Sequence, residues 1–228
     1  MAQLQMTELE VYQGQFGEFT IDSSDRRGVI IYRGGLLVAA LSFAIATGLV
    51  LWQGSDPFIL NVLTLLYFVF WVGLGVSLFT IHIYLKPLHQ ALQAFWAIGG
   101  ITSLMFAVKS SEPLALYIYS HPLTIFGVGF GFAALTGIFF KEAFCFDRLE
   151  TKLLTPLIPV LLLGHLTGFL SIQWEQILLG AWAFLFVVFA IRKVIQPVPP
   201  DIGDKSVFEY LHSQHLRNNA SRLSTPKN

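Results

Sequence analysis

Residues 58–84 read FILNVLTLLYFVFWVGLGVSLFTIHIY, a continuous apolar stretch that decides the fold. The stretch contains no Asp, Glu, Lys or Arg, and it is longer than the about 20 apolar residues that cross the hydrocarbon core of a bilayer. Within lipid, a helix satisfies every backbone N–H and C=O inside a single segment, because no water is available to do so. The stretch therefore predicts a transmembrane helix.

Apolar runs of the same kind occur five more times, at residues 35–52, 91–108, 114–140, 153–172 and 176–191. Ser120-His121-Pro122 interrupts the run 114–140, so the span there is either 114–140 or 123–140, with 114–120 at the membrane interface. Charged residues make up only 12% of the chain, about half of the roughly 25% that soluble domains carry. The runs predict an all-α membrane protein, a bundle of six transmembrane helices. The predicted parts are a polar segment with an interfacial lead-in at 1–34, the six-helix domain at 35–195, and a proline-rich linker with a tail at 196–228.

The basic residues indicate the orientation of this bundle. Of the 14 Lys and Arg residues, all except Lys109 fall in the two tails and the even-numbered gaps between runs. They are Arg26, Arg27, Arg33, Lys86, Lys141, Arg148, Lys152, Arg192, Lys193, Lys205, Arg217, Arg222 and Lys227. Positively charged loops resist translocation across the membrane. Both termini are therefore predicted on the cytoplasmic side, or on the stromal side in a plastid.

Several classes of function find no support in the composition. The net charge is zero, which gives no basis for a nucleic-acid partner. No Asp, Glu, Lys or Arg falls inside a predicted span, and ion-coupled transporters mostly carry such residues there. The single cysteine, Cys145, excludes a disulfide within the chain, and no catalytic signature motif is present. The sequence therefore favours a protein that is not an enzyme.

His165 is the ionisable residue that the predicted spans place nearest to the middle of the membrane. It stands in the sequence Leu163-Gly164-His165-Leu166-Thr167-Gly168. Its imidazole could ligate the metal of a haem or a chlorophyll, with the glycines leaving room for the flat ring. Alternatively, Gly164 and Gly168 form a contact face, and His165 hydrogen-bonds to a neighbouring helix. The packing alternative is favoured, and Gly127 with Gly131 predicts a second face of this kind.

Residues 141–152 form the predicted cytoplasmic loop with the densest group of charged and aromatic side chains. Phenylalanines anchor protein interfaces, while exposed charges of both signs set their register. The loop is therefore predicted to dock a partner protein. The residues assigned to this contact are Glu142, Phe144, Phe146, Asp147, Arg148 and Glu150.

Several short segments resemble an uncharacterised family of integral membrane proteins found in cyanobacteria and plastids. The similar segments are Arg27 to Arg33 with Leu36 and Leu37, Lys141 through Glu150, Leu154 to Pro156, and Gly164 with His165. The resemblance covers residues 25–195 and brings no known reaction. It implies a photosynthetic organism and a thylakoid or plasma membrane location.

Two functions are predicted from these observations. The first is a non-enzymatic protein of the lipid bilayer that assists the assembly, stability or pigment loading of a larger photosynthetic membrane complex. The second is a carrier or pore for a neutral or apolar solute. The first has the predicted docking loop and the resemblance in its favour.

Overall fold

The computed structural model describes residues 10–54, 56–83, 85–207, 210–211, 213–214 and 216. Six helices in these ranges are long and apolar enough to cross a membrane, which confirms the predicted all-α bundle. They are α1 (Ser23–Gln53), α2 (Pro57–Thr80), α3 (Lys86–Lys109), α5 (Ile125–Phe146), α6 (Leu149–Leu166) and α7 (Ile172–Ile195). Residues 1–9 and 217–228 of the two predicted tails lie outside the described ranges.

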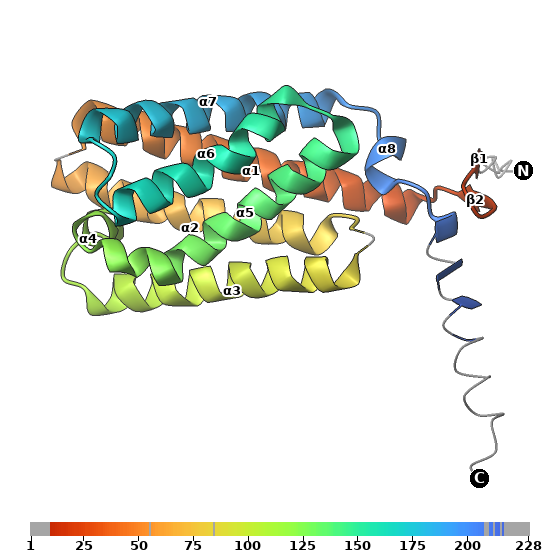
Figure 1. Ribbon diagram of the computed structural model, residues 1–228, viewed down its shortest axis with the longest axis horizontal. Helices are drawn as coiled ribbons and strands as arrows, with labels where there is room; N and C mark the ends of the chain where they lie inside the picture. The colour runs from red at the N-terminus through yellow and green to blue at the C-terminus, as the bar shows by residue number, and fades with distance from the viewer. Residues whose placement is uncertain are drawn as a thin grey trace, which may run out of the picture. The chain divides into compact units, whose positions relative to one another are not determined.

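The chain divides into two compact units, and residues 31–196 form the larger one. In Figure 1 its long helices run side by side along the long axis of the view. Consecutive long helices are antiparallel, so the start of α3, the end of α5, the start of α6 and the end of α7 share one end of the bundle. We call it the basic end, because it carries Arg33, Lys86, Lys141, Arg148, Lys152, Arg192 and Lys193.

The smaller unit comprises the described residues before Ile31 and after Gln196. Its strands β1 (Val11–Gln13) and β2 (Glu18–Thr20) pair antiparallel, and the short helix α8 (Pro199–Ile202) begins within the proline-rich stretch that was predicted as a linker. Ile21, Val29 and Ile202 form its small apolar core. Asp204 accepts hydrogen bonds from the Gln15 amide, at 2.6 Å, and from Ser206.

Small and aromatic residues pack the bundle, as expected where lipid is as apolar as the core. Trp71 of α2 and Trp96 of α3 stack at 4.4 Å, and each indole N–H donates to the other residue's carbonyl, at 3.1 and 2.8 Å. On α3 and α5, a Cβ added at Gly99 would lie 2.3 Å from the Gly131 nitrogen. The predicted contact face at Gly127 and Gly131 is confirmed, because both glycines meet α3.

Several helix bounds differ from the predicted spans. The run 114–140 is broken at His121-Pro122 into the seven-residue helix α4 (Leu114–Ser120), the 3₁₀ helix η1 (Pro122–Thr124) and α5, as in the alternative with the shorter span. Proline lacks the N–H that would continue the α-helical hydrogen bonds. At the other end, α5 continues past Lys141 to Phe146 and stops at Asp147, which has a left-handed φ of 52°. The predicted cytoplasmic loop therefore reduces to Asp147 and Arg148.

Reporter fusions test the orientation. A fusion after Gly54 and one at the C-terminus should report opposite sides of the membrane, because the basic end resists translocation. The expected result is a translocated reporter at Gly54 and a cytoplasmic or stromal one at the C-terminus. The same side for both would contradict the six-helix path.

The Asp204 contact should depend on pH. The hydrogen bonds from Gln15 and Ser206 lower the pKa of this carboxyl below its ordinary value. A lowered folded-state pKa gives a contact that is present at neutral pH and lost as pH falls through that lowered value. We expect the Gln15 amide to lose protection from hydrogen exchange at acid pH, and at every pH in Asp204→Ala, which has no acceptor for the Gln15 N–H. The Gly14 amide, which donates to the Gly17 carbonyl, is the control. Unchanged Gln15 protection in Asp204→Ala would contradict the contact.

Candidate functional site

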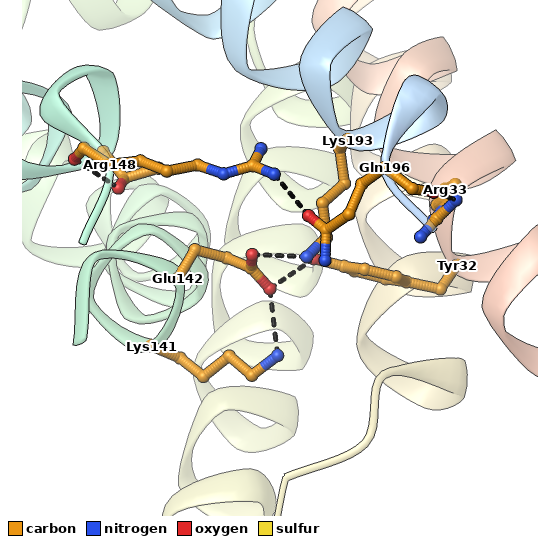
Figure 2. Close-up of polar contacts among 8 residues, drawn as sticks. Tyr32, Arg33, Lys141, Glu142, Arg148, Lys193 and Gln196 are labelled. Atoms are coloured by element: carbon orange, nitrogen blue, oxygen red, sulfur yellow. Dashed lines mark hydrogen bonds and ion pairs between the residues drawn. The ribbon is translucent and has the colours of Figure 1, made fainter. Parts of the chain in front are cut away.

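A group of charged side chains is buried near the basic end of the bundle (Figure 2). Glu142 of α5 is fully buried, and its Oε2 lies 2.5 Å from the Lys193 ammonium of α7, which is also fully buried. Its Oε1 accepts hydrogen bonds from Lys141, at 2.9 Å, and from the Tyr32 hydroxyl of α1, at 3.1 Å. We call Tyr32, Lys141, Glu142 and Lys193 the charge cluster. It joins α1, α5 and α7.

Aromatic rings complete the surroundings of the Lys193 ammonium. Its nitrogen lies 4.1 Å from the centroid of the Phe146 ring and 5.7 Å from that of Tyr32. A cation over an aromatic face is attracted by the ring quadrupole, most strongly where water is excluded. The ion pair with Glu142 and these ring contacts therefore replace the water that would hydrate the ammonium.

A second set of polar contacts connects α1, α6 and the end of α7 near the charge cluster. Arg33 donates to the Gln196 carbonyl at 2.6 Å, at the C-terminal end of α7, where a cation is favoured by the helix dipole. Arg148 donates to the Gln196 side chain (Figure 2). Glu150 of α6 pairs with Arg192 at 2.7 Å. Four helices are thus held together by charged groups at the basic end.

The charge cluster corrects the expectation that the membrane helices carry no charge. Glu142 and Lys193 follow the predicted spans 114–140 and 176–191 in the sequence, but they lie within α5 and α7. A helix does not end where its apolar run ends. A buried charge is tolerated when ion pairing and hydrogen bonds replace its hydration.

The structure places the six predicted docking residues in different surroundings. Glu142 and Glu150 are buried and engaged in ion pairs within the bundle. Phe146 and Arg148 are half-buried. Phe144 is 85% exposed, and the exposed Asp147 forms an ion pair with Lys152. Partner docking stays a prediction, and the exposed side chains available for it are those of Phe144 and Asp147.

The opposite end of the bundle holds a smaller polar group. His165 is the penultimate residue of α6, not a mid-membrane residue as predicted, because α6 ends at Leu166. Its Nδ1 lies 2.8 Å from Oε1 of Glu175, in the first turn of α7. This is the hydrogen bond to a neighbouring helix that the packing alternative predicts. The Tyr119 hydroxyl of α4 donates to Glu175 Oε2 at 3.2 Å. Burial and the Glu175 carboxylate raise the pKa of Tyr119, so the hydroxyl keeps its proton.

Gly164 and Gly168 do not form the predicted contact face between helices. Gly168 has a φ of 66°, a left-handed conformation that glycine adopts without strain, and it follows the last turn of α6. Gly164 lies against the Leu170 side chain, since an added Cβ would be 2.4 Å from Leu170 Cδ1. Both glycines therefore serve the reversal of the chain between α6 and α7.

A cavity of about 620 Å³ adjoins the His165–Glu175 pair. We call it the Glu175 pocket. Its polar lining groups are Tyr119, His165, Glu175 and Gln176, and its other walls are mainly aliphatic and aromatic. The lining side chains come from α1, α2, α4, α5, α6 and α7, and include Leu60, Ala115, Val128, Phe132, Leu161 and Leu179. The volume lies within the roughly 300–1,000 Å³ typical of small-molecule sites.

His165 offers limited access to a ring metal. Nδ1 is engaged by Glu175, and Nε2 is buried without a hydrogen-bond partner among the described residues. An axial bond from Nε2 to haem or chlorophyll would require the side chains around it to move. Within the described ranges, no group of three or more His, Cys, Asp or Glu is placed to hold a metal ion. The cofactor at His165 stays a prediction.

Five residues of these two sites were not assigned from the sequence: Tyr32, Lys141 and Lys193 of the charge cluster, and Tyr119 and Glu175 beside the pocket. In the sequence, Glu175 stands one residue before the span 176–191, and Lys193 stands two residues after it. A charged residue directly beside an apolar run is the signal that identifies Glu175 and Lys193. Their partners are 10 and 51 residues away in sequence, and no local pattern indicates them.

Six apolar helices with their charges gathered at the ends or paired define a multi-pass integral membrane protein. Residues 76–210 match the family described as uncharacterized integral membrane protein (DUF2301). An uncharacterized protein from Haemophilus influenzae is 31% identical over 193 residues, which cover 83% of this chain and 94% of that protein. No solved structure matches the chain. The chain belongs to the DUF2301 family of integral membrane proteins.

The relative from Haemophilus influenzae corrects part of the predicted resemblance. That resemblance was to a family of cyanobacteria and plastids, and this relative is not cyanobacterial. Membership in the family therefore carries no implication of a photosynthetic organism or of a thylakoid location.

The charge cluster can be tested with paired substitutions. Glu142→Gln should destabilise the protein by about 3–5 kcal/mol, because the buried Lys193 ammonium loses its carboxylate, whereas Lys193→Met should cost less, because Lys141 still pairs with Glu142. The double variant should recover part of the Glu142→Gln loss, since the Lys193 charge is removed and only Lys141, which is 12% exposed, still loses the Glu142 carboxylate. Thermal and denaturant unfolding in detergent measures the effect, with Lys152→Met at the exposed Asp147 pair as the control. Equal losses in the control and in Glu142→Gln would contradict a structural role for the cluster.

Proposed function

We propose that this integral membrane protein binds a lipophilic small molecule in the Glu175 pocket and acts as its carrier. This is the second of the two predicted functions. The observation that carries the proposal is one cavity of about 620 Å³ with apolar walls and several polar groups gathered beside it. Small-molecule sites combine an apolar lining with a few polar groups that fix the orientation of the ligand.

The surroundings of the pocket favour a binding site closed toward the basic end over a continuous pore. Along α7, Trp182 and Phe186 lie between Glu175 and Lys193, and both are almost fully buried. Along α5, the fully buried Phe139 lies between Gly129 of the pocket and Glu142. Large side chains therefore fill the bundle between the Glu175 pocket and the charge cluster. A carrier would release its ligand on the side from which it came or after rearranging these helices.

The docking function is the second candidate, and the exposed Phe144 and Asp147 support it. Aromatic anchors beside exposed charge are common at protein interfaces. The photosynthetic character of such a partner has no support from family membership. We retain from this candidate only a partner protein bound at the basic end.

Filling the pocket tests the proposed binding. Ala115→Trp places an indole against the Glu175 pocket, whereas Ala94→Trp makes the same change at an exposed position of α3 outside the pocket. Protein purified in mild detergent should carry a lipophile that native mass spectrometry detects. We expect its occupancy to fall about tenfold or more in Ala115→Trp, the effect of about 1.4 kcal/mol, and to stay unchanged in Ala94→Trp.

Two results would contradict this proposal. One is wild-type protein that carries no lipophile and takes up none from membranes. The other is a lipophile that stays bound equally well in Ala115→Trp, which would place it elsewhere on the protein.

A further inference from the structure

A second cavity, of about 340 Å³, lies between α5 and α6. We call it the α5–α6 groove, and it is lined by Ile125, Phe126, Gly129, Phe130, Ala133 and Thr136 of α5, with Ile158, Pro159, Leu162, Leu163 and Leu166 of α6. Phe126 and Leu163 in this lining are 66% and 55% exposed. The groove therefore opens sideways from the bundle, where lipid surrounds a protein embedded in the membrane.

The groove and the Glu175 pocket adjoin. Ile125, Gly129 and Leu162 line both cavities. At Gly129 an added Cβ would come near one side-chain atom alone, Ile125 Cγ2 at 3.2 Å. The glycine thus leaves space where the two cavities meet. A molecule in the bilayer has a continuous apolar surface to follow, from the side of the bundle to the polar group at Glu175.

The length of the groove fits a single extended hydrocarbon chain. Its α5 lining runs from Ile125 to Thr136, which corresponds to about 16 Å along a helix that rises about 1.5 Å per residue. Nearly all of the side chains along it are apolar, and Thr136 has its hydroxyl engaged with the Phe132 carbonyl. A hydrocarbon chain can lie along such a surface at little cost, because it carries no polar group that would need a hydrogen-bond partner there.

The polar groups of the Glu175 pocket determine which head group such a molecule can have. Each Glu175 oxygen accepts one hydrogen bond, from His165 or Tyr119, and each has a further lone pair. A head group that binds there must therefore donate. A fatty-acid carboxylate has no proton to donate and is repelled by the Glu175 charge, whereas an ammonium loses much hydration on entering an apolar pocket. A hydroxyl donates at a lower desolvation cost.

We propose that the ligand is a single-chain lipid with a hydroxyl head, which enters from the bilayer between α5 and α6. Its hydroxyl donates to Glu175, and its chain lies along the α5–α6 groove. This inference rests on the proposed function, since it names the ligand class and the route to the same pocket.

Photolabelling in lipid nanodiscs tests the route. The probe is hexadecanol that carries a photoreactive diazirine on its chain. Ala133→Trp obstructs the groove alone, Ala115→Trp obstructs the pocket alone, and Ala94→Trp obstructs neither. We expect labelling of Glu175-pocket peptides to fall about tenfold in the first two variants and to stay at the wild-type level in the third.

The outcomes separate the two proposals. A loss in Ala115→Trp without a loss in Ala133→Trp would overturn entry and chain placement in the groove, while the pocket remains a binding site. No loss in either variant would overturn the proposed function and this inference together.

Competition with unlabelled lipids of the same chain length tests the head group. Hexadecanol should compete about tenfold better than hexadecanoic acid or hexadecylamine, and Glu175→Gln should reduce its advantage over the acid. Equal or better competition by the acid would overturn the assigned donor role of the head group. Better competition by the amine would replace the hydroxyl by an ammonium and overturn the neutral-lipid class.

Discussion

The ion pair between Glu142 and Lys193 is the interaction on which the arrangement of the helices depends. Both side chains are fully buried, and both belong to helices that are otherwise apolar over many turns. An unpaired charge in such surroundings costs several kcal/mol, so α5 and α7 are strongly favoured to meet at this register. Tyr32 adds α1 to the same point. Apolar helices in lipid have no hydrophobic force to choose between neighbours, and paired charges supply that specificity.

The two ends of the bundle differ in what their polar groups do. At the basic end, charged groups bond to one another and to the last carbonyls of α7, which fixes four helices. At the opposite end, the polar group of Tyr119, His165 and Glu175 adjoins a cavity, and the short helix α4 replaces the start of a long span. A fixed end and an end that adjoins a cavity form an asymmetry that is consistent with the proposed binding of a ligand.

The sequence was sufficient for the six helices and for one close contact. Long apolar runs can persist in lipid only as helices, and the paired glycines Gly127 and Gly131 indicated the face of α5 that another helix approaches, which the structure shows to be α3. It was insufficient for the ends of the helices. An apolar run ends at the first charged residue, whereas the helix continues beyond that residue, as α5 does past Lys141. It was insufficient for the polar pairs, since Glu142 meets Lys193 across 51 residues. His165 was identified as important, yet the chain reversal at Gly168 placed it at the end of the bundle.

The most direct test of this account is an experimental structure of the protein in a lipid nanodisc, at a resolution that separates side chains. We expect Glu142 to contact Lys193 at the basic end, and elongated density to run from the α5–α6 groove into the Glu175 pocket. A bundle in which Glu142 and Lys193 face away from each other would contradict the account, as would a Glu175 pocket closed by its own side chains.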